Sequence, residues 1–130
     1  MNTKVEISKI LKKLGVSPDQ QGYPYLREAI EMVMGDEAIL HKYITKILYP
    51  TIAQRYNTTS ARVERAMRHS IETSVLKVDL DLYADIFGGC ISADKGKPTN
   101  SQFIGCVADY LVLSQETAGM PDDYHFEVGV

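Results

Sequence analysis

The chain has few cysteines, and they show no arrangement that would bind a metal. Of its 130 residues only Cys90 and Cys106 are cysteine. Neither belongs to a C-x-x-C pair or to a Cys/His cluster with the spacing of a zinc site. Isolated cysteines of this kind are typical of reduced cytosolic proteins, where disulfides are rare. We therefore expect two buried thiols, no metal site and no cofactor.

Long apolar runs are also missing. No stretch approaches the ~18 consecutive apolar residues of a membrane-spanning helix. The N-terminal sequence M-N-T-K-V-E lacks the apolar core of a secretory signal peptide. An apolar content of 45% and a charged content of 24% are ordinary for a globular protein. The sequence therefore predicts a cytoplasmic protein that does not enter a membrane.

Strand-like alternation of apolar and polar residues occurs nowhere convincingly, and there is no internal repeat. Apolar residues instead recur with helical spacing, as in the first helix expected, Thr3–Leu14. The sequence predicts a single compact all-α domain of about six helices over residues 1–114. An acidic, flexible tail is expected over residues 115–130.

Glycine, proline and capping residues set the limits of these helices. Gly15 is expected to end the first helix and Gly35 the second. A third helix is expected from Asp36 to Leu48, where Pro50 ends or kinks it and can open the next. The remaining expected helices are Thr51–Tyr56, Thr59 to about Leu76, Asp79–Phe87, and one that begins at Thr99 or Asn100.

The sequence contains no combination of residues typical of a catalytic site. His41 and His125 have no acid and nucleophile near them in the sequence. His69 lies one turn from charged residues on either side, a poor setting for a general base. The loop D-K-G-K-P-T-N fails as a phosphate loop, because Ile91 replaces the first required glycine and Pro98 follows the lysine. We therefore expect that the protein is not an enzyme.

Charge is unevenly distributed along a chain whose net charge is −3. From Lys42 to His69 there are six basic residues and one acidic residue, a local charge of +5. From Ser70 to Asp94 five acidic residues and one basic residue give −4. A positive patch on a weakly acidic body can steer an anionic partner to one face. Charge blocks of this kind are also common on ordinary solvated surfaces.

The positive region contains the spacing of a helix-turn-helix between Tyr49 and Glu72. Ala53 provides the small residue that lets two helices pack closely, and Asn57 tolerates the left-handed turn between them. Thr59 is a plausible N-cap for the second helix. At 100° per residue, the second helix has an apolar side and a charged side. The apolar side comprises Val63, Ala66, Met67, Ser70, Ile71 and Ser74.

The charged side of this second helix suits the major groove of DNA. Its early residues lie deepest in the groove, so Arg62, Glu64 and Arg65 are expected to contact bases. Arg68 and His69 lie a turn further on and are expected to meet phosphates. The alternative is an exposed helix whose charges pair for solubility, with Glu64 bonded to Arg68. Further backbone contacts are expected from Thr59, Ser60, Lys46, Lys95 and Lys97.

Three stretches closely resemble one known family. They are I-T-K-I-L-Y-P-T-I-A, N-T-T-S-A-R-V-E-R-A-M-R-H-S-I-E and K-G-K-P-T-N-S-Q-F-I-G-C-V-A-D. They resemble the C-terminal effector domain of the sporulation stage-zero response regulator, a transcription factor of endospore-forming bacteria. The similarity covers roughly Val5 to Leu113.

The resemblance implies a six-helix domain that binds double-stranded DNA at short G/C-containing boxes. It also implies tandem binding of copies with self-association on DNA, and RNA polymerase as a further partner. Arg62, Glu64 and Arg65 match the family's base-reading positions, and Lys97 matches a lysine in the loop before the last helix. The competing explanation for Lys95 and Lys97 is that they are solvated loop lysines.

Three features depart from the family. The order Ser60-Ala61 is reversed relative to the usual pair, and Val75–Val78 replaces a Trp-Ser-Arg-Gly-like segment. The sequence contains no stretch that resembles the family's receiver domain, so we expect either a domain that acts without a receiver or a fragment of a longer regulator. An alternative function is therefore a non-catalytic interaction module that has lost its receiver and titrates or antagonises a full-length regulator.

Overall fold

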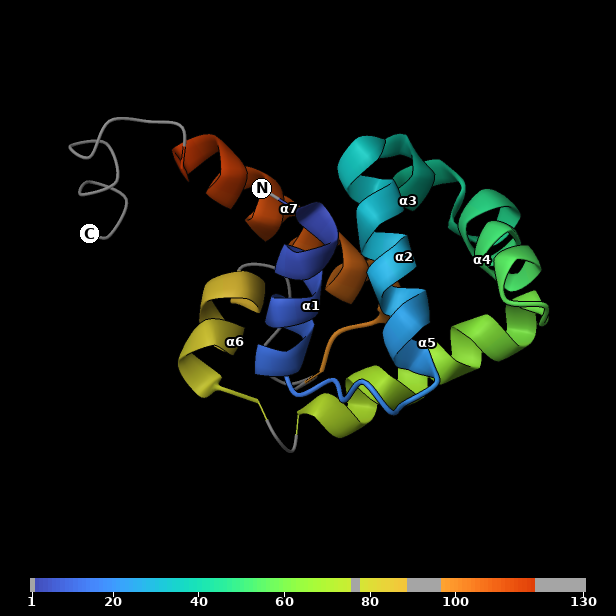
Figure 1. Ribbon diagram of the computed structural model, residues 1–130, viewed down its shortest axis with the longest axis horizontal. Helices are drawn as coiled ribbons and strands as arrows, with labels where there is room; N and C mark the ends of the chain where they lie inside the picture. Colours follow the sequence, from blue (N-terminus) through green and yellow to red (C-terminus); the bar gives the residue numbers. More distant parts are fainter. Residues whose placement is uncertain (1, 76–77, 89–96, 119–130) are drawn as a thin grey trace.

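The computed structural model describes residues 2–75, 78–88 and 97–118, and their regular structure is entirely helical (Figure 1). This confirms the predicted all-α class. Among these residues there are seven α-helices and one π-helical segment, η1. In chain order they are α1 (Thr3–Lys13), α2 (Gly22–Gly35), α3 (Ala38–Lys42), η1 (Ile44–Leu48), α4 (Tyr49–Arg55), α5 (Ser60–Ser74), α6 (Leu80–Phe87) and α7 (Asn100–Ala118).

Short polar residues begin α1, and a glycine ends it. The Asn2 side chain accepts a hydrogen bond from the amide of Lys4 at 3.0 Å, which satisfies one of the unpaired amides at the helix start. Gly15 has a φ of 89°, a left-handed conformation that residues with a Cβ rarely adopt. The predicted limits of the first helix are therefore confirmed.

Helix α2 lies at the centre of the fold. It packs against α1, α3, α4, α5 and α7, and it is surrounded by them in Figure 1. Its buried residues include Leu26, Ala29, Ile30 and Val33, all at most 2% exposed. Because one helix contacts five others, the packing of α2 fixes where α5 lies.

The helix predicted from Asp36 to Leu48 is interrupted, which corrects that prediction. Helix α3 ends at Lys42, Tyr43 leaves the helical conformation with φ −131° and ψ 22°, and η1 follows. In an uninterrupted α-helix the Pro50 ring would clash with the carbonyl of Lys46. The wider π-helical turn directly before α4 accommodates that proline, and the amide of Leu48 reaches back to the carbonyl of Tyr43 at 3.0 Å.

Helices α4 and α5 form the predicted helix-turn-helix. Asn57 has a φ of 54° and provides the left-handed turn residue. The Thr59 side chain accepts a hydrogen bond from the amide of Arg62 at 3.2 Å, as expected of an N-cap. Ala53 is 4% exposed and Ile52 is fully buried, so the small residue lies between the packed helices as predicted.

Helix α7 begins where the sequence predicted. Thr99 and Gln102 exchange hydrogen bonds, each side chain accepting from the backbone amide of the other at 3.2 and 3.0 Å. This reciprocal capping box fixes the helix start. The helix continues to Ala118, so the tail boundary expected at residue 115 lies inside α7. Residues 119–130 lie outside the described part of the chain.

Cys106 lies on α7 and is disulfide-bonded, so the expectation of two reduced thiols is wrong. That expectation rested on the low frequency of disulfides in cytosolic proteins. A frequency of this kind does not determine whether an individual cysteine is bonded in a particular fold. Cys90 lies outside the described residues. None of the described helices is long and apolar enough to cross a membrane.

Candidate nucleic-acid interface

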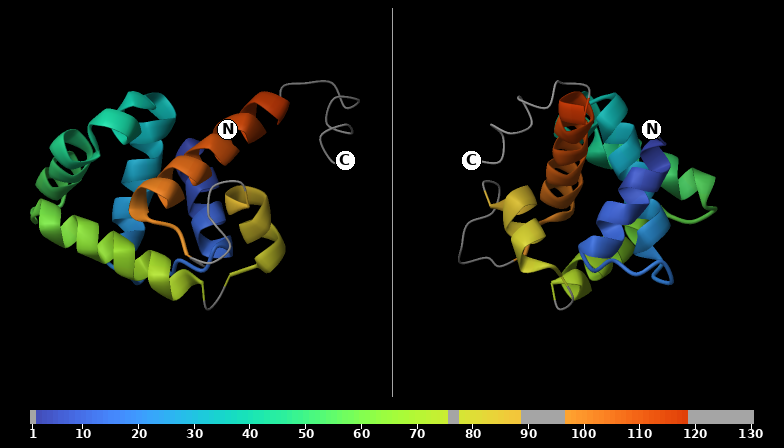
Figure 2. Two further views of the ribbon diagram at one scale, coloured as in Figure 1. Left: turned by 180° about the vertical axis from the view of Figure 1, so that it is seen from behind. Right: turned by 60° about the vertical axis from the view of Figure 1, so that its left-hand side comes forward.

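Helix α5 is held in place by one buried side. Val63, Met67 and Ile71 are at most 1% exposed, and α5 packs against α2, α4 and α7. The predicted apolar side is confirmed except at Ala66, which is half-buried. The helix runs along one edge of the molecule, at the bottom of Figure 1 and of both views in Figure 2. Its opposite side therefore faces solvent.

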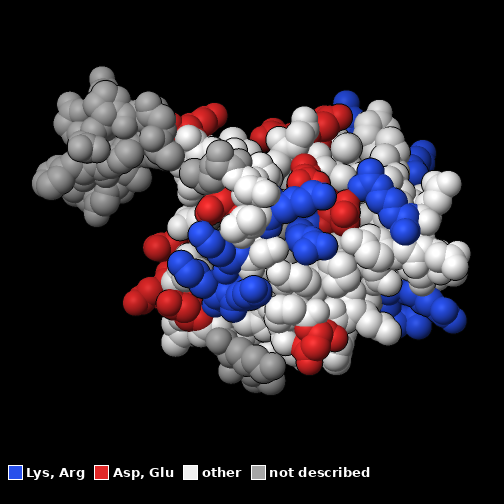
Figure 3. All heavy atoms as spheres, viewed as in Figure 1, with Lys and Arg blue, Asp and Glu red and all other residues white. Residues whose placement is uncertain are grey.

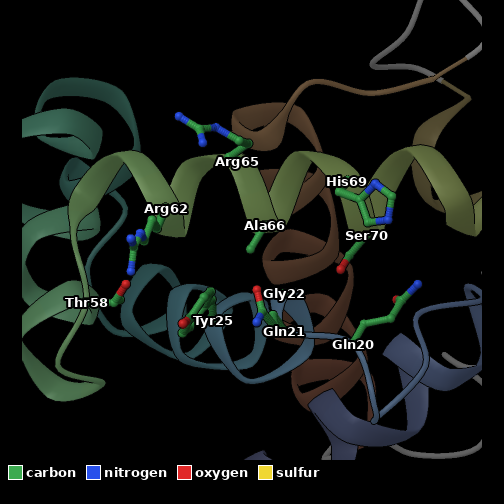
Figure 4. Close-up of a pocket in the computed structure, with 10 residues that line it drawn as sticks. All are labelled: Gln20, Gln21, Gly22, Tyr25, Thr58, Arg62, Arg65, Ala66, His69 and Ser70. Carbon is green, nitrogen blue, oxygen red and sulfur yellow. The ribbon is translucent and has the colours of Figure 1, made fainter.

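The charged side of α5 is the exposed one. Arg62, Arg65, Arg68 and His69 are exposed and Glu64 is half-buried. Arg65 lies opposite the buried stripe in the helical rotation, and Figure 4 shows its side chain pointing away from α2. The exposed side of α5 from Arg62 to His69 is thus accessible to a large partner.

One flank of this exposed side is occupied by ion pairs. The guanidinium of Arg68 lies 2.9 Å from the carboxylate of Glu64, and the ammonium of Lys97 lies 2.6 Å from Glu72. The hydrogen bond and charge of Lys97 lower the pKa of the Glu72 carboxyl. These pairs are solvent-exposed, so they contribute little to stability. Their effect is to place two cations in fixed positions beside α7.

The other flank has basic residues that have no acidic partner within the described ranges. Arg62, Arg65 and His69 take part in none of the ion pairs among the described residues. They border a groove of about 720 Å³ between α5 and the start of α2 (Figure 4). The groove is lined by Gln20, Gln21, Gly22, Tyr25, Thr58, Arg62, Arg65, Ala66, His69 and Ser70.

A buried hydrogen-bond network ties α5 to α4 and α7. The Asn100 amide group donates to the Tyr49 hydroxyl and to the backbone carbonyl of Glu64, both at 3.1 Å. Burial raises the pKa of the Tyr49 phenol, which keeps the hydroxyl neutral. From the sequence, Asn100 was expected only to cap a helix. Its bonds to Glu64 and Tyr49, which lie 36 and 51 positions away, could not be predicted from the pattern of charged and apolar residues.

Comparison with known families decides the identity of this fold. The chain matches the family described as "Sporulation initiation factor Spo0A C terminal" over residues 7–111. The chain belongs to this family. Spo0A C-terminal domains are DNA-binding effector domains of a transcription factor, so the chain is a DNA-binding transcription-regulator domain and not a member of a known enzyme family. The family resemblance drawn from the sequence is confirmed.

The Spo0A-type fold brings most of the predicted contact residues onto or beside α5. Thr59 caps α5, Ser60 is its first residue, and Lys97 reaches it through Glu72. Lys46 is exposed on η1, whose main contacts are with α3 and α4. Lys95 lies outside the described residues. The role of each residue in DNA binding remains a prediction.

Proposed function

We propose that this Spo0A-type domain binds double-stranded DNA sequence-specifically, with α5 in the major groove. The observation that carries the proposal is the outer side of α5. There Arg62 and Arg65 are exposed and form no ion pair with another described residue, on a helix held by its buried side. A rigid helix that presents unpaired arginines can reach base edges with little loss of side-chain interactions.

Base recognition is proposed for Arg62, Glu64 and Arg65. An arginine fork can donate to the O6 and N7 atoms of guanine, and a carboxylate can accept from the N4 amino group of cytosine. The ion pair with Arg68 holds the Glu64 carboxylate in position. These chemistries suit boxes that contain G/C pairs.

Backbone contacts are proposed for residues at the ends and flanks of α5. The N-terminus of α5 attracts phosphate through its free amides, and the Thr59 and Ser60 hydroxyls lie there. Arg68, His69, Lys46, Lys95 and Lys97 are proposed to supply positive charge to phosphates. Tandem binding of two copies and contact with RNA polymerase are proposed on the family resemblance alone.

A titration of labelled duplexes tests the proposal. Fluorescence anisotropy should show tighter binding to a duplex that carries the family's G/C-containing box than to a shuffled duplex of equal composition. Affinity for both should fall steeply with added salt, because binding releases counterions from the phosphates. Equal affinity for box and shuffled duplex at every salt concentration would refute sequence-specific recognition.

A further inference from the structure

The outer side of α1 is a basic surface. At about 100° per residue, Lys9, Lys12 and Lys13 fall within one arc of this helix, and all three are exposed. The buried residues of α1 fall on the opposite side. Lys9, Lys12 and Lys13 are named here the α1 basic face. Figure 3 shows Lys and Arg side chains gathered over α1.

Little negative charge in the described part of the chain balances this face. Lys9 lies 3.8 Å from the carboxylate of Glu6, and both side chains reach solvent, so the pair is weak. Lys12 and Lys13 take part in no ion pair within residues 2–75, 78–88 and 97–118. Val5 lies in the same arc and is 45% exposed. The face therefore combines free positive charge with one exposed apolar side chain.

The end of α7 brings the next segment of the chain to this face. Helix α7 ends at Ala118 and packs against α1. Thr3, the first residue of α1, lines the same surface pocket as Gln115 and Glu116 near the end of α7. In Figure 1 the N-terminal end of α1 lies beside this part of α7. The chain therefore enters residues 119–130 beside the start of α1.

The composition of residues 119–130 complements the α1 basic face. Their sequence, G-M-P-D-D-Y-H-F-E-V-G-V, contains three acidic residues and no lysine or arginine. Tyr124 and Phe126 follow directly after the two aspartates. Aromatic rings of this kind pack on exposed apolar side chains and on the methylene stems of lysines. Both the charge and the apolar character of the segment thus match the face.

Residues 119–130 are also long enough to cover the face. A segment of twelve residues spans up to ~40 Å when it is extended. The 11 residues of α1 rise only about 16 Å. Asp122 and Asp123 follow Ala118 within five residues, so they can lie beside the middle of α1. Glu127 can then lie beside the end of the helix.

We propose that residues 119–130 bind to the α1 basic face of the same chain, with Asp122 and Asp123 paired to its lysines. Exposed ion pairs are individually weak, but the short connection to α7 gives the aspartates a high effective concentration at the face. The bound segment covers lysines that would otherwise attract any polyanion. Positive charge on α5 stays uncovered, so polyanions are directed to that helix.

Neutralising the two aspartates in the full chain tests the contact. Asp122→Asn with Asp123→Asn should change the ¹⁵N–¹H amide shifts of residues 5–13, because the lysines of α1 lose their partners. The difference from the wild type should disappear at ~1 M salt, where the Debye length is about 3 Å and the segment is released in both proteins. Unchanged α1 shifts at low salt would overturn the proposal.

Glu37→Gln with Asp109→Asn is the matched control. It also removes two exposed carboxylates, and both line the groove between α3 and α7 rather than the outer side of α1. It should leave the α1 shifts unchanged, whereas changes of equal size in the two variants would show a general charge effect. If Asp122→Asn with Asp123→Asn shifted only residues of the α3–α7 groove, the segment would bind there and the proposal would be wrong.

Exchanging the charges tests the pairing itself. Lys9→Glu with Lys12→Glu should release residues 119–130, which lowers their heteronuclear NOEs. Adding Asp122→Lys and Asp123→Lys should restore those NOEs, because the pairs form again with the charges reversed. If the NOEs did not recover in the fourfold variant, charge pairing would not hold the segment.

Binding of heparin, a soluble polyanion, measures the masking of the face. Asp122→Asn with Asp123→Asn should raise heparin affinity at least about threefold over the control variant, which has the same net charge. Equal heparin affinity in the two variants would refute the masking. Box preference over a shuffled duplex enters neither measurement, so this proposal and the proposed function can fail separately.

Discussion

Arg65 and Arg68 have the same side chain, and their surroundings give them different tasks. Arg65 is exposed, forms no ion pair within the described part of the chain, and is directed away from the fold (Figure 4). Arg68 lies three residues further along α5 and is bonded to Glu64 at 2.9 Å. An unpaired guanidinium can turn toward a guanine edge, whereas a paired one keeps a fixed position suited to a phosphate.

Alanine substitution should therefore separate the two arginines. Arg65→Ala should cost about 1–3 kcal/mol in binding to the box and should reduce the preference for box over shuffled duplex. Arg68→Ala should weaken binding to both duplexes alike, because a phosphate contact carries no sequence information. Anisotropy titrations of both duplexes with each variant provide the measurement.

Lys4→Ala is the control for the loss of one positive charge. Lys4 is exposed in the first turn of α1, and the start of α1, beside the N-terminus marked in Figure 1, lies away from α5. Its affinity for both duplexes should stay near that of the wild type. If Arg65→Ala retained full box preference, the base-reading assignment of Arg65 would be wrong.

Individual turn and capping residues were predictable from the sequence, and distant partners were not. Asn57 and Thr59 act through atoms within three residues of themselves, so their roles follow from local chemistry. The pairing of Glu64 with Arg68 follows from helical spacing and was weighed as an alternative to base contact. The bond between Lys97 and Glu72 joins residues 25 positions apart, and only the fold brings them together.

At the scale of helices, the orientation of α5 depends on its neighbours. Helix α4 holds its N-terminal half through the turn, α2 crosses it at Gly22, and Asn100 at the start of α7 bonds to its backbone. A recognition helix must enter the groove at a fixed angle to present several side chains at once. Asn100 is therefore expected to be a positioning residue for α5.

Asn100→Ala should destabilise the fold by about 1–3 kcal/mol, because it leaves the buried Tyr49 hydroxyl without its donor and removes the tie to Glu64. Tyr49→Phe removes only one of the two bonds and should cost about 0.5–1.5 kcal/mol. Urea denaturation gives both free energies of unfolding.

Duplex affinity, measured where each variant is folded, then shows whether the network positions α5. Asn100→Ala should weaken box binding more than Tyr49→Phe, because only the alanine variant loses the bond to the α5 backbone. If the two variants bound the box equally well, Asn100 would be a stabilising residue without a positioning role.

The existence of most helices was predictable, and the interruption after α3 was not. Apolar spacing continues from Ile39 to Leu48 as it would in one helix. The break at Tyr43 and the π-helical turn arise because Pro50 must be accommodated where the chain enters α4. Periodicity detects a helical face and is insensitive to a local widening of the helix.

For the whole molecule, the net charge of −3 is the sum of acidic and basic side chains that lie on different parts of the surface. Figure 3 shows Asp and Glu side chains over α6 and Lys and Arg side chains near the N-terminal end of α5. This agrees with the charge blocks read along the chain. Figure 3 also shows a basic cluster over α1, which sequence reasoning did not single out because it considered the region from Lys42 onward. An uneven field of this kind can orient the domain as it approaches DNA.

The central claim is that the outer side of α5 reads DNA, and an NMR map of the complex tests it most directly. Uniformly ¹⁵N-labelled protein is titrated with the box duplex, and intermolecular NOEs are collected from the arginine side chains. We predict the largest amide shifts along α5, with NOEs between Arg65 and base protons in the major groove. Shifts confined to α3 and α7, with no NOE from α5 to any base, would contradict the account.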